Sequence, residues 1–127
     1  MNSNVDYIID LGDKTKIVSI EKSIKAKEKY TKIIDKECFL YMTTIDGRIK
    51  AMSKYWGSNY NVPIYVNDDL CFLKVDKYVW INVCNVEKIV EKNIIFLSGM
   101  TLHFEISKRN LKEKIVRLKD IIKNVKK

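Results

Sequence analysis

The amino-acid sequence predicts a single α+β domain, in which an antiparallel β meander carries one internal helix and ends in a basic C-terminal helix. After Pro63, short strand-like runs recur at intervals of roughly eight to twelve residues between turn signals. Helical apolar faces lie at Ile45–Trp56 and at Leu111–Val125. Neither a low-complexity linker nor an internal repeat divides the 127 residues. We therefore expect residues 1–127 to form one domain.

The first predicted element is a β-hairpin, because the apolar runs Tyr7–Leu11 and Lys16–Ile20 surround a Gly-Asp turn. Residues 21–29 are almost entirely polar, and we expect them to form an exposed connection whose lysines are solvated. The apolar run Cys38–Met42 is too short to form a helix of its own. It predicts a buried strand.

The internal helix is predicted by apolar residues that recur at spacings of four, three and four between Ile45 and Trp56. Thr44 or Asp46 is a suitable N-cap, and Gly57 stands where a helix C-terminal glycine belongs. We expect the aromatic residues around Gly57 to lie in the core. The opposite side of this helix carries the basic residues Arg48, Lys50 and Lys54.

The second half of the chain predicts a series of short strands followed by a helix. The expected strands are Ile64–Val66, Leu70–Val75, Tyr78–Val83, Val86–Val90, Ile94–Leu97 and Met100–Ile106. The helical seam then consists of Leu111, Ile115, Leu118, Ile122 and Val125, with Ser107 as its N-cap. Two roles stay open for this seam, packing on the sheet of its own chain or forming a dimer contact.

Positive charge is concentrated in the C-terminal helix. The formal net charge is +8, and residues 108–127 contain nine basic and two acidic side chains, so +7 of it lies there. This asymmetry indicates a polyanionic partner such as DNA, RNA or an anionic surface. No apolar run approaches the roughly 18–20 residues of a membrane-spanning helix, and the N-terminus lacks the features of a signal peptide. We therefore expect a cytoplasmic protein without a membrane partner.

The sequence offers little support for an enzyme, a metal site or a cofactor. His103 is the only histidine and stands on the polar side of a predicted strand, without a serine or cysteine motif near it. The three cysteines are not arranged in pairs, and we interpret them as small buried hydrophobic residues. They are Cys38, Cys71 and Cys84.

Several colinear blocks resemble the competence transcription factor ComK family of Gram-positive bacteria. The most specific is Ser53–Tyr60, which is similar to the family's aromatic-aromatic-Gly-Ser-x-Tyr block, with a Pro-Ile strand after it. The remaining blocks are Lys32–Glu37, Val62–Asn67, Leu70–Leu73, Val79–Ile81 and Ile95–Leu102. The resemblance implies an activator of competence genes that recognises paired AT-rich boxes, engages the minor groove and acts as an oligomer.

The chain departs from the family pattern in two loops and at its C-terminal end. The family's basic, glycine-containing loop after the Gly-Ser-x-Tyr block is reduced to Asn61-Val62, and the loop between Cys71 and Trp80 is also shorter. The family's C-terminal tail, which serves regulated proteolysis, is not matched in this sequence. Our hypothesis is that the basic C-terminal helix compensates for the DNA contacts of the lost loop.

Residues and resemblance together predict a transcription regulator that binds AT-rich double-stranded DNA as a homo-oligomer. The predicted phosphate contacts are Arg48, Lys50, Lys54, Arg109, Lys112, Lys114, Arg117, Lys119 and Lys123. Ser58, Asn59 and Asn61 are predicted to donate minor-groove hydrogen bonds, unless their segment only ends the helix. Two alternative functions remain: a protein-interaction or inhibitor module that docks an acidic partner through the basic helix, and an RNA- or ribosome-associated protein.

Overall fold

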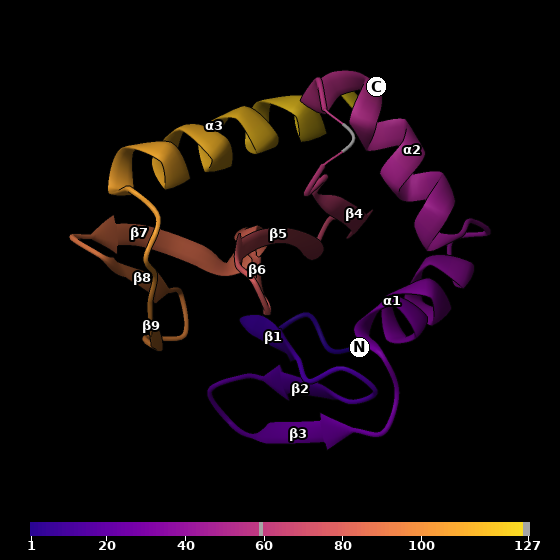
Figure 1. The fold of residues 1–127 in the computed structure, drawn as a ribbon, viewed down its shortest axis with the longest axis horizontal. Coiled ribbons are helices and arrows are strands. Elements are labelled where there is room, and N and C mark those ends of the chain that lie inside the picture. The colour runs from indigo at the N-terminus through magenta and orange to yellow at the C-terminus, as the bar shows by residue number, and fades with distance from the viewer. Residues whose placement is uncertain (59, 126–127) are drawn as a thin grey trace.

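Two antiparallel sheets and three α-helices make up the computed structural model, which describes residues 1–58 and 60–125 (Figure 1). The six-stranded sheet has the order β3-β2-β1-β6-β5-β4 and the smaller sheet the order β7-β8-β9. The strands are β1 (Tyr7–Asp10), β2 (Thr15–Val18), β3 (Ser23–Ala26), β4 (Ile64–Asn67), β5 (Leu70–Asp76), β6 (Val79–Asn82), β7 (Val86–Val90), β8 (Asn93–Phe96) and β9 (Thr101–His103). The helices are α1 (Tyr30–Phe39), α2 (Ile45–Trp56) and α3 (Lys108–Val125). The predicted α+β class is confirmed.

The N-terminal hairpin forms as predicted, but it is extended by a third strand. Residues 21–29 are largely exposed, as predicted, but they are not only a connection, because Ser23–Ala26 form β3 and pair with β2. β3 is an edge strand, and Lys25 on it lies opposite Lys16 of β2. An exposed edge strand needs no apolar alternation, and its lysines discourage pairing with other chains. This is why its composition resembles that of a loop.

The predicted strand at Cys38–Met42 is wrong, because α1 extends to Phe39 and a tight turn follows it. Ile34 and Cys38, one helical turn apart, are the buried residues of α1. Phe39, Leu40 and Met42 are 77%, 72% and 96% exposed. The apolar run therefore forms the end of a helix and an exposed turn. A run of this length is equally compatible with a strand, so its sequence does not distinguish the two.

Helix α2 begins and ends at the predicted residues. Thr44 Oγ1 accepts a hydrogen bond from the Gly47 N–H at 3.0 Å, and Asp35 Oδ1 accepts one from the Ile45 N–H at 2.7 Å. Both bonds satisfy N–H groups that have no partner within the helix. At the other end Gly57 adopts a φ of +79°, in the left-handed region that ends many helices.

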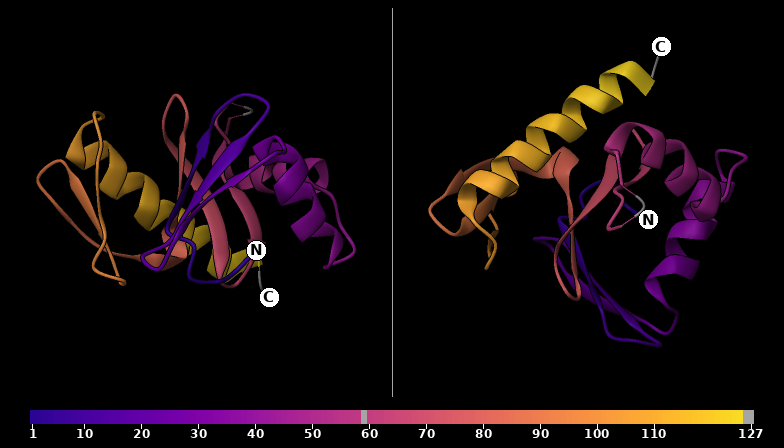
Figure 2. Two further views of the ribbon diagram at one scale, coloured as in Figure 1. Left: turned by 90° about the horizontal axis from the view of Figure 1, so that it is seen from below. Right: turned by 45° about the horizontal axis from the view of Figure 1, so that its top comes forward.

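Helix α3 packs on its own chain, so the seam has the first of its two predicted roles. It runs along the three-stranded sheet towards the C-terminal end of α2 (Figure 1 and Figure 2). Its buried residues are Leu111, Ile115, Leu118 and Ile121. Ile121, which was not predicted, thus belongs to the buried seam, and the predicted Ile122 is half-buried. The side chain of Val125 is not among those that the structure describes. Ser107 Oγ accepts from the Asn110 N–H at 3.1 Å, which confirms the predicted N-cap.

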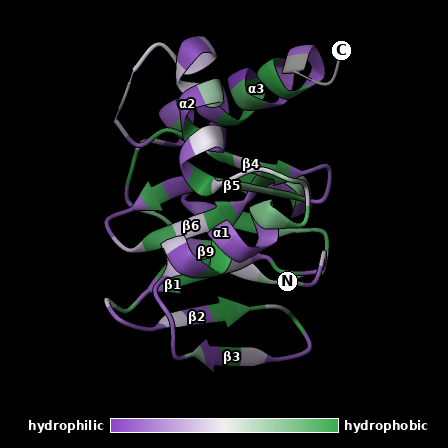
Figure 3. Ribbon diagram, turned by 90° about the vertical axis from the view of Figure 1, so that its right-hand side faces the viewer, coloured by the Kyte–Doolittle hydropathy of each residue, from purple (hydrophilic) through white to green (hydrophobic). Residues whose placement is uncertain are grey.

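The six-stranded sheet separates two hydrophobic clusters. Leu73 and Ile81 point into a cluster shared with α3 and the small sheet, whereas Phe72 and Trp80 point into one shared with α1. Because β5 and β6 are covered on both faces, their sequences are nearly continuous apolar runs. Figure 3 shows the hydrophobic residues concentrated on the strands and the helices more mixed. Within the described ranges, every helix is too short or too polar to cross a bilayer.

Buried polar groups fasten the N-terminal segment to the sheet. Asn82 is fully buried, and its side-chain amide donates to the carbonyls of Val5 and Asp69, each at 2.9 Å. Its Oδ1 accepts from the N–H groups of Cys71 at 3.0 Å and Cys84 at 3.3 Å. One side chain therefore joins three segments that are distant in sequence.

Candidate nucleic-acid interface

The predicted basic residues of α3 lie on two different flanks of the helix. Lys112, Lys119 and Lys123 follow one another at spacings of seven and four residues, so they share one flank. Lys114 and Arg117 occupy the other flank. All five residues are exposed, as is Arg109, which forms an ion pair with Glu113 at 3.0 Å. The helix is therefore cationic on both sides rather than on one continuous face.

Arg117 is engaged within the protein. Its Nη2 atom donates to the carbonyl of Trp56 and, at 3.3 Å, to that of Tyr55. Its guanidinium carbon lies 4.9 Å from the centroid of the Trp56 ring. A cation at this position satisfies carbonyls that have no partner within α2 and complements the helix dipole. Arg117 thus fastens α3 to the end of α2.

The side chain of Arg48 also points into the protein, so it does not belong to a basic outer surface of α2. It donates from Nη2 to the Val66 carbonyl at 3.1 Å and lies 5.5 Å from the centroid of the Tyr65 ring. Its buried Nε has no hydrogen-bond partner among the described residues. Lys50 and Lys54 are exposed, as predicted.

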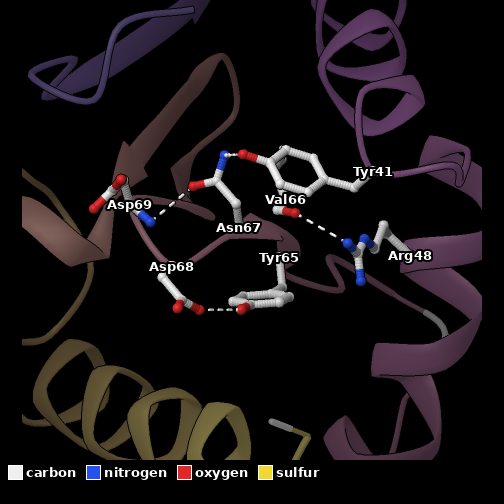
Figure 4. Close-up of a pocket in the computed structure, with 7 residues that line it drawn as sticks. All are labelled: Tyr41, Arg48, Tyr65, Val66, Asn67, Asp68 and Asp69. Atoms are coloured by element: carbon white, nitrogen blue, oxygen red, sulfur yellow. Dashed lines mark hydrogen bonds between the residues drawn. The ribbon is translucent and has the colours of Figure 1, made fainter.

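Arg48 forms one wall of a polar pocket, which Figure 4 shows between α2 and the turn after β4. Asn67 Nδ2 donates to the Tyr41 hydroxyl at 3.0 Å, and the Tyr65 hydroxyl donates to Asp68 Oδ1 at 2.5 Å. Burial raises the pKa of the Tyr65 hydroxyl well above its ordinary value, and the hydrogen bond to Asp68 adds a smaller increase. The lining contains two carboxylates, from Asp68 and Asp69, against one guanidinium. This pocket is poorly suited to a polyanion.

The aromatic residues around Gly57, at the end of α2 and after it, are more exposed than predicted. Trp56 is buried, but Tyr55 and Tyr60 are 51% and 78% exposed, so the expectation that these aromatics all lie in the core is wrong. Ser58 Oγ accepts from the Tyr60 N–H at 3.0 Å, and the exposed Asn61 has a φ of +50°. The predicted contact Asn59 lies outside the described residues.

A groove, called here the basic groove, brings part of this segment together with α3 and the β5–β6 hairpin. Three lysines and one carboxylate belong to its lining, and of the lysines Lys74 has its ammonium at the Trp80 ring, 5.8 Å from the ring centroid. Its lining residues are Tyr60, Asn61, Lys74, Val75, Asp76, Lys77, Ile106 and Lys114. Two of the predicted DNA contacts, Asn61 and Lys114, therefore share one site although they are far apart in sequence.

Six of the eight lining residues of the basic groove were not predicted as contacts, and three of these are basic or aromatic: Tyr60, Lys74 and Lys77. Lys77 is exposed, with its ammonium 5.3 Å from the Tyr78 ring centroid, whereas the half-buried Lys74 places its ammonium 5.8 Å from that of Trp80. A signal was present, because Lys77 lies in the turn between two predicted strands, Lys74 lies close before it, and Tyr60 belongs to the Gly-Ser-x-Tyr block. Only the fold shows that this turn reaches α3.

Comparison with known proteins gives one result that covers nearly the whole chain. A family model described as ComK protein matches residues 9–127. No curated protein matches the chain. The matched range includes α2, the basic groove and all of α3 that the structure describes.

Proposed function

The chain belongs to the ComK family, a family of competence transcription factors, and on this premise we propose that it binds AT-rich double-stranded DNA in the cytoplasm as a homo-oligomer. The observation that carries the proposal is the basic groove. It joins Lys77 and Lys114 to Asn61 in the segment that follows the family's most specific block. Cations placed beside a hydrogen-bonding side chain supply the two parts of DNA recognition, phosphate contact and base readout.

Each group has a definite role in this proposal. The ammonium groups of Lys77 and Lys114 neutralise phosphates and release counterions. Ser58 and Asn61 donate to the adenine N3 and thymine O2 acceptors of the minor groove, where a G·C pair would add an amino group. Lys50 and Lys54, on the helix that leads into this segment, are further phosphate contacts. Arg48 and Arg117 are left out of the interface because their guanidinium groups contact the protein.

Anisotropy titrations test the proposal with three labelled probes at two salt concentrations: an AT-box duplex, a GC-matched duplex and a structured RNA. We expect the AT-box duplex to bind at least about tenfold more tightly than either other probe. Equal, purely salt-dependent binding to all three would contradict sequence-selective regulation. Light scattering on the complex with the AT-box duplex tests the homo-oligomer, and one chain per duplex would contradict it.

Charge reversal locates the interface. The double variant Lys77→Glu/Lys114→Glu should weaken binding to the duplex by about tenfold or more and lower the slope of log affinity against log salt by about two. The matched control is Lys16→Glu/Lys25→Glu, which makes the same charge change on β2 and β3, at the opposite edge of the six-stranded sheet (Figure 1). Equal losses in the two double variants would show that net charge, not the groove, determines binding.

A further inference from the structure

A second groove lies on the other flank of α3, between this helix and β7. Its apolar lining includes the half-buried Ile89 from β7 and, from α3, the buried Ile115 and the exposed Val116. Val116 is 68% exposed, although it follows the buried Ile115 directly. We call this site the α3–β7 groove. It presents aliphatic surface to solvent on an otherwise strongly charged helix.

The rim of the α3–β7 groove is cationic. Lys88 of β7 stands on one side, and Lys112 and Lys119 of α3 stand on the other; all three are exposed. Glu87 also lines the groove, so three positive charges face one negative charge. Val116 lies four residues after Lys112 and three before Lys119, which places the apolar side chain between the two ammonium groups on the helix surface.

We propose that the α3–β7 groove binds an acidic amphipathic helix of a protein partner. Leucine-like side chains of such a helix would cover Ile89 and Val116, and its flanking carboxylates would pair with Lys88, Lys112 and Lys119. This inference goes beyond DNA binding and does not depend on it. It gives the chain a protein-binding surface that is separated from the basic groove by the width of α3.

The apolar lining of the groove favours a protein partner over a nucleic acid. Phosphates would satisfy the three lysines of the rim, but they would leave Ile89 and Val116 without an apolar partner. Lys112 and Lys119 are also predicted phosphate contacts, so the same two residues receive different roles in the two assignments. The exposed Val116 separates these roles, because its side chain adds affinity only for a partner that buries apolar surface.

The test uses a labelled synthetic peptide of roughly four helical turns, with leucines on one face and glutamates on both flanks. A scrambled peptide of identical composition is the matched probe, because it keeps the charge and loses the apolar face. We expect the full-length protein to bind the amphipathic peptide at least about tenfold more tightly than the scrambled one. Equal binding of the two peptides would overturn the proposal.

Variants then assign the peptide to the groove. Val116→Ser and Lys112→Glu/Lys119→Glu should each weaken binding of the peptide by about tenfold, whereas Lys77→Glu/Lys114→Glu should leave it unchanged. Thermal unfolding verifies that each variant is folded. Val116→Ser should leave the affinity for the AT-box duplex unchanged. Unaltered peptide binding by Val116→Ser, or a loss of duplex binding in that variant, would overturn the proposal, the second result by assigning this flank to DNA.

Discussion

At the scale of single residues, Asp6 is held where ionisation is unfavourable. Asp6 is 1% exposed, and its Oδ2 atom accepts a hydrogen bond from Ser98 Oγ at 2.6 Å. Burial raises the pKa of this carboxyl and outweighs the hydrogen bonds from Ser98 and Asn85, which lower it. The folded state therefore binds the Asp6 proton more tightly than the unfolded chain does.

We expect Asp6 to make a contribution to the free energy of unfolding that changes with pH. Because its pKa is raised in the folded state, the contribution of Asp6 is fully present below its ordinary value of 3.8 and is lost as the pH rises through the folded pKa. As the pH rises from about 4, the free energy of unfolding of the wild type should therefore fall relative to that of Asp6→Asn. The difference between the two should become constant above the folded pKa of Asp6. Urea unfolding at a series of pH values measures the difference.

The exposed residue Asp13 provides the control, because Asp13→Asn removes the same charge from a solvated turn. A difference between Asp6→Asn and the wild type that stays constant with pH would contradict the role of Asp6.

Individual capping residues could be predicted from the sequence, whereas the partners of the arginines could not. Thr44, Gly57 and Ser107 act on the backbone within a few residues of themselves, so their local context is sufficient. Arg48 and Arg117 bind carbonyls 18 and 61 residues away in sequence. A long basic side chain has the same appearance in a sequence whether it faces solvent or caps a distant helix.

At the scale of elements, α3 and α2 are joined through Arg117, and this contact predicts a stability effect. Arg117→Lys keeps the charge but loses the planar group that stacks on Trp56 and donates to the carbonyls at the end of α2. We expect the free energy of unfolding to fall by about 1–2 kcal/mol. Denaturant titration of the purified variant measures this change.

Arg109→Lys on the same helix is the matched control, since Arg109 forms only an exposed ion pair with Glu113. It should cost less than about 0.5 kcal/mol. Equal losses for Arg109→Lys and Arg117→Lys would contradict the link between the helices.

Elements in which apolar residues recur at regular helical spacing could be predicted from the sequence. Elements whose surroundings do not require such spacing could not. The spacing of Ile45–Trp56 and of Leu111–Ile122 gives α2 and α3, because each buries one face only. β3 has no covering layer to demand apolar residues, and the last turn of α1 runs into exposed hydrophobic residues. In the basic groove, Asn61 and Lys114 could be proposed from the sequence, but their proximity depends on the packing of α3.

At the scale of the whole molecule, Asn82 helps to attach the N-terminal segment to the sheet. Asn82→Ala would remove the side-chain partner of the Asp69 carbonyl and of the Cys71 and Cys84 N–H groups, and would leave the Val5 carbonyl with its hydrogen bond from Asn85 Nδ2 alone. We expect the free energy of unfolding to fall by about 3 kcal/mol or more. Asn67→Ala, which removes two exposed hydrogen bonds, should cost about half of that or less. Denaturant titrations of both variants provide the comparison, and equal losses would contradict the special role of Asn82.

The strand order also affects how the chain folds as it is synthesised. β1 lies in the interior of the six-stranded sheet, with Ile8 paired to Ile17 on one side and to Trp80 on the other. The first pairing is available as soon as the N-terminal hairpin leaves the ribosome, but the second requires β6. Until Asn82 has emerged, the hairpin exposes an unpaired strand edge, the kind of edge on which nascent chains aggregate. Closure of this sheet is therefore a late, non-local event in folding.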